Sequence, residues 1–539
     1  MKFLLAFSLL LSTAALRAES NAFKLAKGVD VYFSVLRNLD MGYVDTLYFD
    51  KLIRVSIEEM LNSLDPYTEL ISEEKSTDFD FSTTGQYGGV GMLISSRNQG
   101  GTEIMEVYEG TPAHKAQLSP GDKILAIDNL LISDTKVDEV SKALKGKIGS
   151  SLQLKVLKYN NLDTITLSIT REKIHLPAVP YFAILPNTNI GYIAFSTFTK
   201  DCSEEVKKAL VELKKQGAAG IVLDLRNNTG GLLEEAVKIV NFFVDKGQTV
   251  VSIKGRVGGE TRYTTKNAPI DTRIPLTVLI NRQSASAAEI VAGALQDIDR
   301  AVIVGQKSYG KGLVQSVLDL PFNERIKLTT AKYYTPSGRC VQAINYHTSN
   351  GSKPQRDTVF REFKTANGRT VYDAGGVTPD TLLQLAAMPS VLQAMYEKGI
   401  IFDYANFYRK QHSALPANFS LTDANYQQLI DFVKAQKFTY QSTEEQKVKE
   451  LEQLLSQKSA LPDSIAQQLA SLKAFASQKA DNVFNLYRTQ IQEVIEEEIA
   501  SRYLLNKGRY QYMLRHDTEV TAAKKILQSP QQYNGFLKK

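Results

Sequence analysis

The sequence predicts a multidomain α/β protein, and three stretches of different character indicate this fold class. Residues 186–345 alternate short β-branched runs with amphipathic helical patterns, which is typical of parallel strands covered by helices. Residues 81–172 are dense in glycine and in short β-type runs, whereas the chain after Leu382 repeats apolar residues at spacings of three and four. At 539 residues, the chain is long enough for several such domains.

The amino-acid composition and net charge indicate an ordinary globular protein rather than a nucleic-acid-binding one. Hydrophobic residues make up 43% and charged residues 23%, as in ordinary globular proteins. The net charge of +6 comes from 64 basic and 58 acidic residues and includes no long basic run. We therefore expect no nucleic-acid partner.

Residues 1–18 read MKFLLAFSLLLSTAALRA, with one lysine, an apolar run and then small residues. This pattern predicts a secretory signal peptide cleaved after Ala15 or Ala18, with a retained anchor as the alternative. Cys202 and Cys340 are the only cysteines. They can pair in an oxidising compartment, or Cys340 can pack as a small apolar residue.

Residues 22–80 carry apolar residues at helical spacing and predict two or three helices ending near residues 64–68. We expect these side chains to pack in a core. The stripe consists of Val29, Val31, Tyr32, Val35, Leu36, Leu52, Ile53, Val55, Ile57 and Met60.

Within residues 81–172, strands are predicted at 104–107, 124–127 and 152–157, and one helix at 136–144. A glycine-rich loop leading into a strand can aim backbone N–H groups at a peptide's terminal carboxylate, while the strand edge pairs with the peptide backbone. The alternative is a simple turn. The candidate substrate-binding residues are Gly88, Gly89, Val90, Gly91 and Met92.

The next stretch predicts strands at 189–195 and 220–225, with helices at 202–216 and 232–243. Gly230 and Gly231 stand where a strand turns into a helix. Their N–H groups can point at a bound anion, although a tight turn explains the pair equally well.

Residues 275–315 predict a strand, a small polar turn, a helix beginning at Ser286, and a second strand at 301–304. At a helix start, free backbone N–H groups can hold a developing oxyanion beside a serine. Ser286 and Glu289 also match a capping box, which serves helix stability alone.

Lys311 lies between Gly310 and Gly312, which allow close backbone approach. A nucleophilic serine needs a base, and none of the five histidines is near in sequence. A lysine can replace histidine where burial lowers its pKa, as in known serine–lysine pairs.

Residues 305–312 nearly match a phosphate-binding loop, but Gly312 supplies no hydroxyl and residues 313–318 predict a strand rather than a helix. We therefore expect no bound nucleotide. The scattered histidines and unpaired cysteines indicate no metal site, and we expect no cofactor.

Seven motifs occur in one order along the chain. They are LDPYT (64–68), GGVGM (88–92), PGDKILAID (120–128), LDLRNNTGG (223–231), SASAAEIVAGALQD (284–297), YGKGLVQ (309–315) and YYTPSGR (333–339). Together they resemble the carboxyl-terminal processing proteases, also called tail-specific proteases, which are serine endopeptidases with a PDZ domain. The resemblance covers most of residues 30–380.

The resemblance implies a crotonase/ClpP-like α/β protease core with an inserted PDZ-like β domain. The expected parts are a signal peptide (1–18), an N-terminal helical region (19–80), the PDZ-like domain (81–172), the Ser/Lys protease core (173–382) and a C-terminal all-helical domain (383–539).

For the site, the resemblance implies Ser286, rather than Ser284, as nucleophile, Lys311 as general base and Gln315 as the residue that orients the lysine. It also implies an oxyanion hole from Gly230, Gly231 and the Ala287 N–H. Glu289 and Asp297 resemble residues common in the family, although helix capping and surface solvation account for them equally well.

The implied function is an exported endopeptidase, in the bacterial periplasm, that captures the carboxyl end of a protein and cleaves nearby through an acyl-enzyme. A homodimer contact through residues 22–80 is implied as well. The C-terminal domain is either structural or dimerising, or it binds an adaptor protein. Two alternatives stay open: a non-catalytic PDZ scaffold on a degenerate protease core, and a crotonase-like acyl-transfer enzyme.

Overall fold

The computed structural model describes residues 20–97, 101–133, 135–346, 354–373, 375–384, 387–456 and 462–538. The described residues fall into two compact units, one up to Leu70 and the other from Ile71 onward. The expected signal peptide lies outside the described residues.

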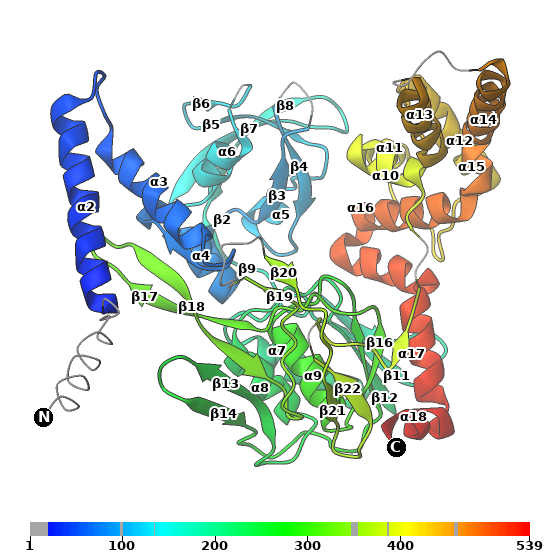
Figure 1. The fold of residues 1–539 in the computed structure, drawn as a ribbon. Helices are drawn as coiled ribbons and strands as arrows, with labels where there is room; N and C mark the ends of the chain where they lie inside the picture. Colours follow the sequence, from blue (N-terminus) through cyan, green and yellow to red (C-terminus); the bar gives the residue numbers. More distant parts are fainter. Residues whose placement is uncertain are drawn as a thin grey trace, which may run out of the picture. The chain divides into compact units, whose positions relative to one another are not determined.

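The first unit contains α2 (Asn21–Gly42) and α3 (Phe49–Asn62), blue in Figure 1, where the sequence predicts helices. The prediction that their apolar stripe packs in a core is wrong for most of it. Val29, Val31, Tyr32, Val35, Leu52, Val55 and Met60 are between 39% and 59% exposed. Two helices are too small a body to bury all the apolar surface that they carry.

The core of the second unit is a six-stranded sheet in the order β10-β11-β12-β15-β16-β23. β10 runs antiparallel to β11, and the other neighbouring pairs are parallel. The strands are β10 (Tyr181–Ile184), β11 (Ile190–Ala194), β12 (Gly220–Asp224), β15 (Leu276–Ile280), β16 (Val302–Gly305) and β23 (Thr381–Leu382).

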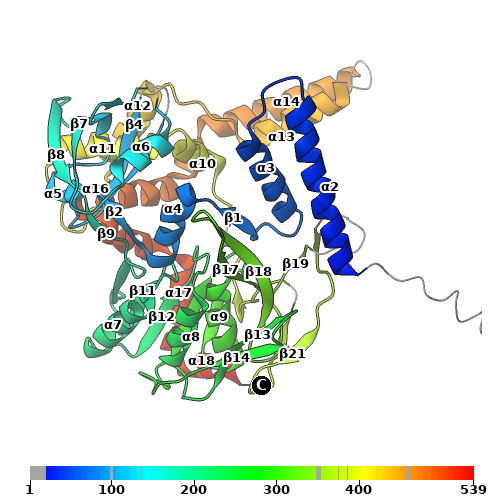
Figure 2. The same cartoon turned by 90° about the vertical axis from the view of Figure 1, so that its left-hand side faces the viewer.

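Helices cover both faces of this sheet (Figure 1 and Figure 2). Alternating residues of β12 explain the layering, because Ile221 and Leu223 join one apolar cluster and Val222 joins the other. The first cluster includes residues of α7 (Cys202–Lys215), α8 (Leu233–Asn241) and α9 (Ala287–Asp297); the second includes residues of α17 (Thr518–Gln528) and α18 (Pro530–Leu537). The prediction of a mixed α/β fold is confirmed.

A second sheet contacts α8 and α9, two helices of the first cluster, through its strand β13. Its strand β18 pairs antiparallel with β13 on one side and with β17 on the other. The chain returns from this region at β23, which pairs parallel with β16. The strands are β13 (Thr249–Gly255), β14 (Glu260–Thr264), β17 (Leu313–Asp319) and β18 (Arg325–Tyr334).

An antiparallel sheet with the order β3-β4-β5-β7-β8 contains the three predicted strands of residues 81–172. β3 is an edge strand of this sheet, and α6 packs beside it. The elements are α4 (Glu73–Thr84), β2 (Gln86–Gly89), β3 (Met92–Ser95), β4 (Thr102–Val107), α5 (Pro112–Lys115), β5 (Lys123–Ile127), β6 (Leu130–Leu131), α6 (Val137–Leu144), β7 (Ser151–Leu157), β8 (Thr164–Thr170) and β9 (Glu172–His175).

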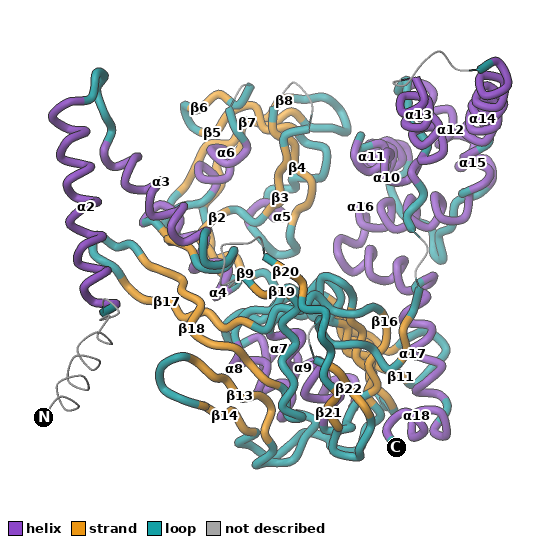
Figure 3. Tube along the Cα trace, viewed as in Figure 1, coloured by secondary structure: helices purple, strands orange, loops and turns teal. Residues whose placement is uncertain are grey.

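The described residues after Leu382 are mostly helical, as predicted (purple in Figure 3). Tyr404, Leu429 and Ile495 belong to a separate apolar core of this region. Its helices are α10 (Ser390–Glu397), α11 (Ile400–Gln411), α12 (Asp423–Ala435), α13 (Thr443–Ser456), α14 (Asp463–Asp481), α15 (Val483–Leu486) and α16 (Arg488–His516). Among the described residues, no helix is long and apolar enough to cross a membrane.

Candidate active site

Ser286 stands at a sharp turn between β15 and α9. Its backbone has φ 57° and ψ −116°, a conformation that costs a non-glycine residue energy and that recurs at strand-to-helix turns presenting a nucleophile. Ser286 is half-buried, whereas Ser284 is fully buried and its Oγ donates a hydrogen bond to the Leu225 carbonyl at 2.7 Å. Of the two serines, Ser286 therefore has the more accessible hydroxyl.

Gly230 lies directly against this turn. Its φ is 97°, and a Cβ at this position would come within 2.7 Å of Ser286 Cβ and 2.9 Å of Ala287 N. Only glycine permits this approach. The structure thus brings together the sequence-predicted residues Gly230, Ser286 and Ala287.

The backbone donors around Ser286 are not equivalent. The Ala287 N–H is the first of α9 and cannot be bonded within the helix. In a parallel bridge around Gly231, the Phe198 N–H donates to the Gly230 carbonyl and the Leu232 N–H donates to the Phe198 carbonyl. The N–H of Gly231 itself therefore points away from Phe198. The Gly230 N–H donates to Asn228 Oδ1 at 2.9 Å, so a role for it at an oxyanion requires the Asn228 side chain to release it.

Glu289, on the first turn of α9, connects the serine turn to the lysine loop. Its Oε2 accepts the Ser286 and Lys311 N–H groups at 2.9 and 2.8 Å. Its Oε1 accepts Ser308 Oγ at 2.6 Å and the Gly310 N–H at 2.8 Å. Burial raises the pKa of this carboxyl to about 7, against the opposing effect of these donors.

The interpretation of Glu289 and Asp297 as solvated surface residues is wrong. Glu289 is 0% exposed and Asp297 2% exposed. Asp297 forms an ion pair at 2.8 Å with Arg339, which is itself buried. Glu289 also accepts the Ser286 N–H as a capping residue does, so the expectation of helix capping is confirmed for Glu289.

Tyr333 makes a second connection between the same two segments. Its hydroxyl donates to the Lys311 carbonyl at 2.6 Å and is shared with the Ser286 carbonyl at 3.2 Å. The side chain is 1% exposed. The backbones of Ser286 and Lys311 are therefore joined through their N–H groups by Glu289 and through their carbonyls by Tyr333.

Lys311 is half-buried between two tightly packed glycines. A Cβ on Gly310 would lie 2.5 Å from Ala343 Cβ, and one on Gly312 would lie 2.8 Å from Gln342 N. The close approach predicted for these glycines is confirmed. Gln315 follows in β17, with its Nε2 donating to Thr329 Oγ1 at 3.1 Å.

The glycine-rich segment 88–92 spans two strands. Gly88 and Gly89 belong to β2, which pairs with β9, and Met92 begins the edge strand β3. Val90 and Gly91 form the link, where Gly91 has φ 82° and packs against Thr111. The segment thus leads directly into an edge strand with a helix at its side.

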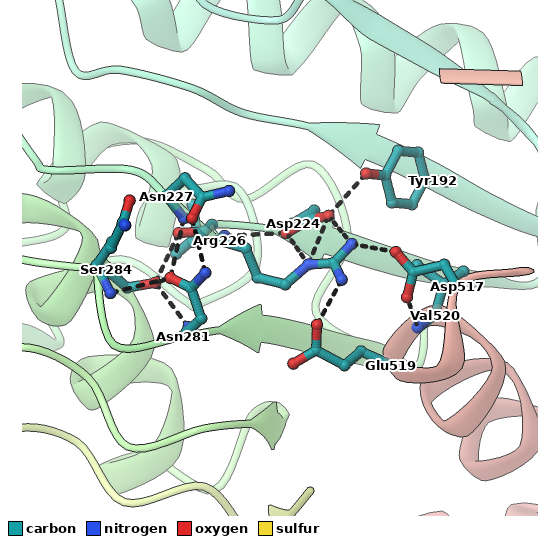
Figure 4. Close-up of polar contacts among 11 residues, drawn as sticks. Tyr192, Asp224, Arg226, Asn227, Asn281, Ser284, Asp517, Glu519 and Val520 are labelled. Atoms are coloured by element: carbon teal, nitrogen blue, oxygen red, sulfur yellow. Dashed lines mark hydrogen bonds and ion pairs between the residues drawn. The ribbon is translucent and has the colours of Figure 1, made fainter. Parts of the chain in front are cut away.

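Sequence reasoning missed Tyr333 and a polar network beneath the serine turn (Figure 4). In this network, Tyr192 donates to Asp224, Asp224 binds Arg226, and Asn227 pairs with Asn281. The LDLRNNTGG motif contains three of these residues and is the signal that marks them. Among the described residues, no group of three or more His, Cys, Asp or Glu side chains is arranged to hold a metal, and Cys202 and Cys340 are free thiols.

Three family models match this chain. The model of "Peptidase family S41" matches residues 189–350, and the "PDZ domain" model matches residues 80–157. A third, described as "Probable PDZ-protease, C-terminal helical domain", matches residues 391–527. The fold and these matches define a peptidase with a PDZ domain and a helical C-terminal region.

Two relatives are similar over much of their length. A carboxy-terminal-processing protease of Bartonella bacilliformis is 36% identical over 332 residues, covering 60% of this chain and 74% of that protein. A carboxyl-terminal-processing protease of a Synechocystis species is 39% identical over 297 residues, covering 54% and 68%. The chain belongs to the carboxyl-terminal-processing protease family.

The solved structures below are less similar in sequence than these two relatives. The photosystem II D1 C-terminal processing protease is 28% identical, with a TM-score of 0.37, over 66% of this chain and 86% of that one. The PDZ domain of a carboxy-terminal protease from Vibrio cholerae, in complex with peptide, is 28% identical with a TM-score of 0.15, over 17% of this chain and 99% of that one.

Proposed function

We propose that this protein is a serine endopeptidase in which Ser286 attacks the peptide carbonyl and Lys311 is the general base. The single observation that carries the proposal is the double connection of the Ser286 and Lys311 segments through Glu289 and Tyr333, with Gly230 packed against the serine turn. Family membership supports the peptidase class.

In the proposed reaction, neutral Lys311 takes the proton from Ser286 Oγ as the oxygen bonds to the substrate carbonyl carbon. The Ala287 N–H and the glycine turn at Gly230 and Gly231 stabilise the resulting oxyanion. Lys311 then gives its proton to the leaving amine, and the acyl-enzyme forms. A water molecule loses a proton to Lys311 and attacks the ester carbonyl, and Lys311 returns this proton to Ser286 Oγ as the ester bond breaks. Gln315 is proposed to orient the lysine.

We propose that the substrate is the carboxyl end of a protein, bound at segment 88–92 with its backbone added to the edge of β3 beside α6. Backbone N–H groups at such a loop suit a carboxylate, and an edge strand offers unpaired groups to an extended chain. The PDZ match and the edge position of β3 support this assignment.

We also propose the domain organisation, the cellular location and the protein partners. The mainly parallel sheet with α7, α8 and α9 on one face supports a crotonase/ClpP-like core within residues 173–382, between the PDZ-like domain (81–172) and the helical domain (383–539). The leader pattern of residues 1–18 supports export to the periplasm. The exposed apolar side chains of α2 and α3, in region 19–80, support a homodimer. For the helical domain, a structural or dimerising role and an adaptor-binding role both remain proposals.

The test compares Ser286→Ala, Lys311→Ala and the control Lys307→Ala on an unstructured protein substrate such as casein. Lys307 lies in the same loop and is also half-buried. We expect the first two variants to lose cleavage and the control to retain it. Full cleavage by either dyad variant contradicts the mechanism. An inactive wild type favours the PDZ scaffold, and hydrolysis of an acyl-CoA instead of casein favours the crotonase-like enzyme.

A further inference from the structure

A buried charge cluster ties the turn after β12 to the last helices of the chain. The Arg226 guanidinium binds Asp224 Oδ2 through Nη2 at 2.6 Å, Asp517 Oδ2 through Nη2 at 2.7 Å and Glu519 Oε2 through Nη1 at 2.5 Å (Figure 4). Asp517 and Glu519 are 291 and 293 residues away from Arg226 in sequence.

The cluster is shielded from solvent. The side chains of Arg226, Asp224, Asp517 and Glu519 are 13%, 8%, 8% and 5% exposed. Three carboxylates surround one guanidinium, and burial raises the pKa of Glu519 against the lowering effect of Arg226. In such a site, loss of one partner leaves a buried charge poorly compensated, so the remaining groups must move.

The carboxylate positions are fixed by α17. Asp517 caps this helix, since its Oδ1 accepts the Val520 N–H at 2.8 Å while Oδ2 binds Arg226. Val520, Ala523 and Ile526 pack in the apolar cluster on the face of the sheet opposite to α9. The packing of α17 against the sheet therefore holds the Asp517 and Glu519 carboxylates in fixed positions.

On its other side, the Arg226 turn is bonded to the serine turn. Asn227 and Asn281 exchange two hydrogen bonds: the Asn227 N–H donates to Asn281 Oδ1 at 3.0 Å, and Asn281 Nδ2 donates to Asn227 Oδ1 at 2.8 Å. The Ala285 N–H donates to the Asn228 carbonyl at 3.0 Å. Through these hydrogen bonds, a displacement of the Arg226 guanidinium also displaces the residues that flank Ser286 and Gly230.

We propose that Asp517 and Glu519 are positioning residues for the reaction: by holding Arg226, they set the separation between the Gly230–Gly231 turn and Ser286. The inference rests on the proposed function of Ser286. It assigns the C-terminal helical segment a part in forming the oxyanion site, because small misplacements at a reacting centre cost large factors in rate.

The test uses the full chain with Asp517→Asn, Glu519→Gln and the double variant. Asn retains a helix-capping acceptor, and both changes keep the shape of the side chain while removing its charge. The matched control is Glu496→Gln, a buried carboxylate of the helical region that accepts Ser420 Oγ and the Leu421 N–H and does not contact Arg226.

Three readouts are compared: p-nitrophenol release from a peptidyl p-nitrophenyl ester, kcat and KM on casein, and backbone hydrogen exchange of residues 225–231 and 284–287. We expect the double variant to lose at least tenfold in ester acylation and kcat, with KM within threefold and faster exchange at both turns. The control should lose less than twofold at a similar fall in Tm.

Acylation and exchange within twofold of wild type in the double variant would overturn the inference, as would equal losses in the control. Failure of the proposed function gives a different result, because wild type itself then releases no p-nitrophenol above the Ser286→Ala background.

Discussion

Ser286 and Lys311 donate their backbone N–H groups to the same carboxylate oxygen, Oε2 of Glu289, at 2.9 and 2.8 Å. The two residues proposed to carry the reaction are thus aligned by a buried acceptor rather than by their positions in sequence. Four donors meet this carboxylate in all, so its charge and shape are both required for the geometry.

The first prediction concerns Glu289→Gln. The amide NH2 replaces one acceptor oxygen, and it then faces N–H donors that it cannot accept. We expect kcat on casein to fall about a hundredfold. Glu234→Gln, an exposed carboxylate in the first turn of α8, is the control and should keep wild-type kcat. Wild-type activity in Glu289→Gln would show that the shared acceptor is dispensable.

The second prediction is a pH dependence that arises from the same residue. Burial raises the pKa of Glu289 from 4.5 to about 7, so the folded chain binds this proton more tightly than the unfolded chain. The associated stability is fully present below pH 4.5 and is lost as the pH rises through 7, by roughly 3 kcal/mol in total.

Activity should change in the opposite direction, because the ionised carboxylate is the form that accepts all four donors. Urea unfolding at pH 5 to 8 should therefore give a free energy of unfolding that falls with pH in wild type, with a smaller slope in Glu289→Gln, while kcat/KM of wild type rises across pH 7. Identical slopes in the two proteins would refute this assignment.

Local sequence patterns predict only part of this site. The turn at Ser286 was predictable because a β-branched strand, small polar residues and a helical pattern follow one another locally. The burial of Glu289 was not, because a capping box looks the same whether or not a second loop, here residues 308–311, closes over it. The prediction that the apolar stripe of α2 and α3 is buried is wrong for a similar reason, since periodicity shows an apolar face but not what covers it. Asp517 and Glu519 meet Arg226 only through the folding of distant segments.

Tyr333→Phe is the third prediction. It removes the hydroxyl shared by the Lys311 and Ser286 carbonyls and leaves these two half-buried acceptors without this donor. We expect a loss of about 1 kcal/mol in the free energy of unfolding and a several-fold loss in kcat. The neighbouring Tyr334→Phe is the control. Equal effects of the two changes would show that the shared hydroxyl does not matter.

The fourth prediction is that Gly230→Ala abolishes activity. The added Cβ would come within 2.7 Å of Ser286 Cβ, at a position with φ 97°. Gly217→Ala is a matched control, because its φ of 88° gives similar backbone strain with no atom within 4 Å of the new Cβ. We expect both variants to lose about 1 kcal/mol of stability from strain, and only Gly230→Ala to lose more than a hundredfold in kcat. Similar kcat values in the two would argue against close approach at the serine.

A fifth prediction addresses α16. Leu505 has φ 54° and ψ −146° inside this helix, a conformation accessible almost only to glycine. Leu505→Gly should raise the free energy of unfolding by about 1 kcal/mol, whereas Leu504→Gly, at a helical position, should lower it by about as much. Urea denaturation of both variants checks this, and a destabilised Leu505→Gly would contradict it.

Attack by Ser286 with Lys311 as its base can be examined by trapping the acyl-enzyme from a peptidyl ester and locating the adduct by tandem mass spectrometry. We expect an ester adduct on Ser286 in wild type and none in Lys311→Ala under the same conditions. An adduct on Ser284, or an equal yield on Ser286 without the lysine, would contradict it.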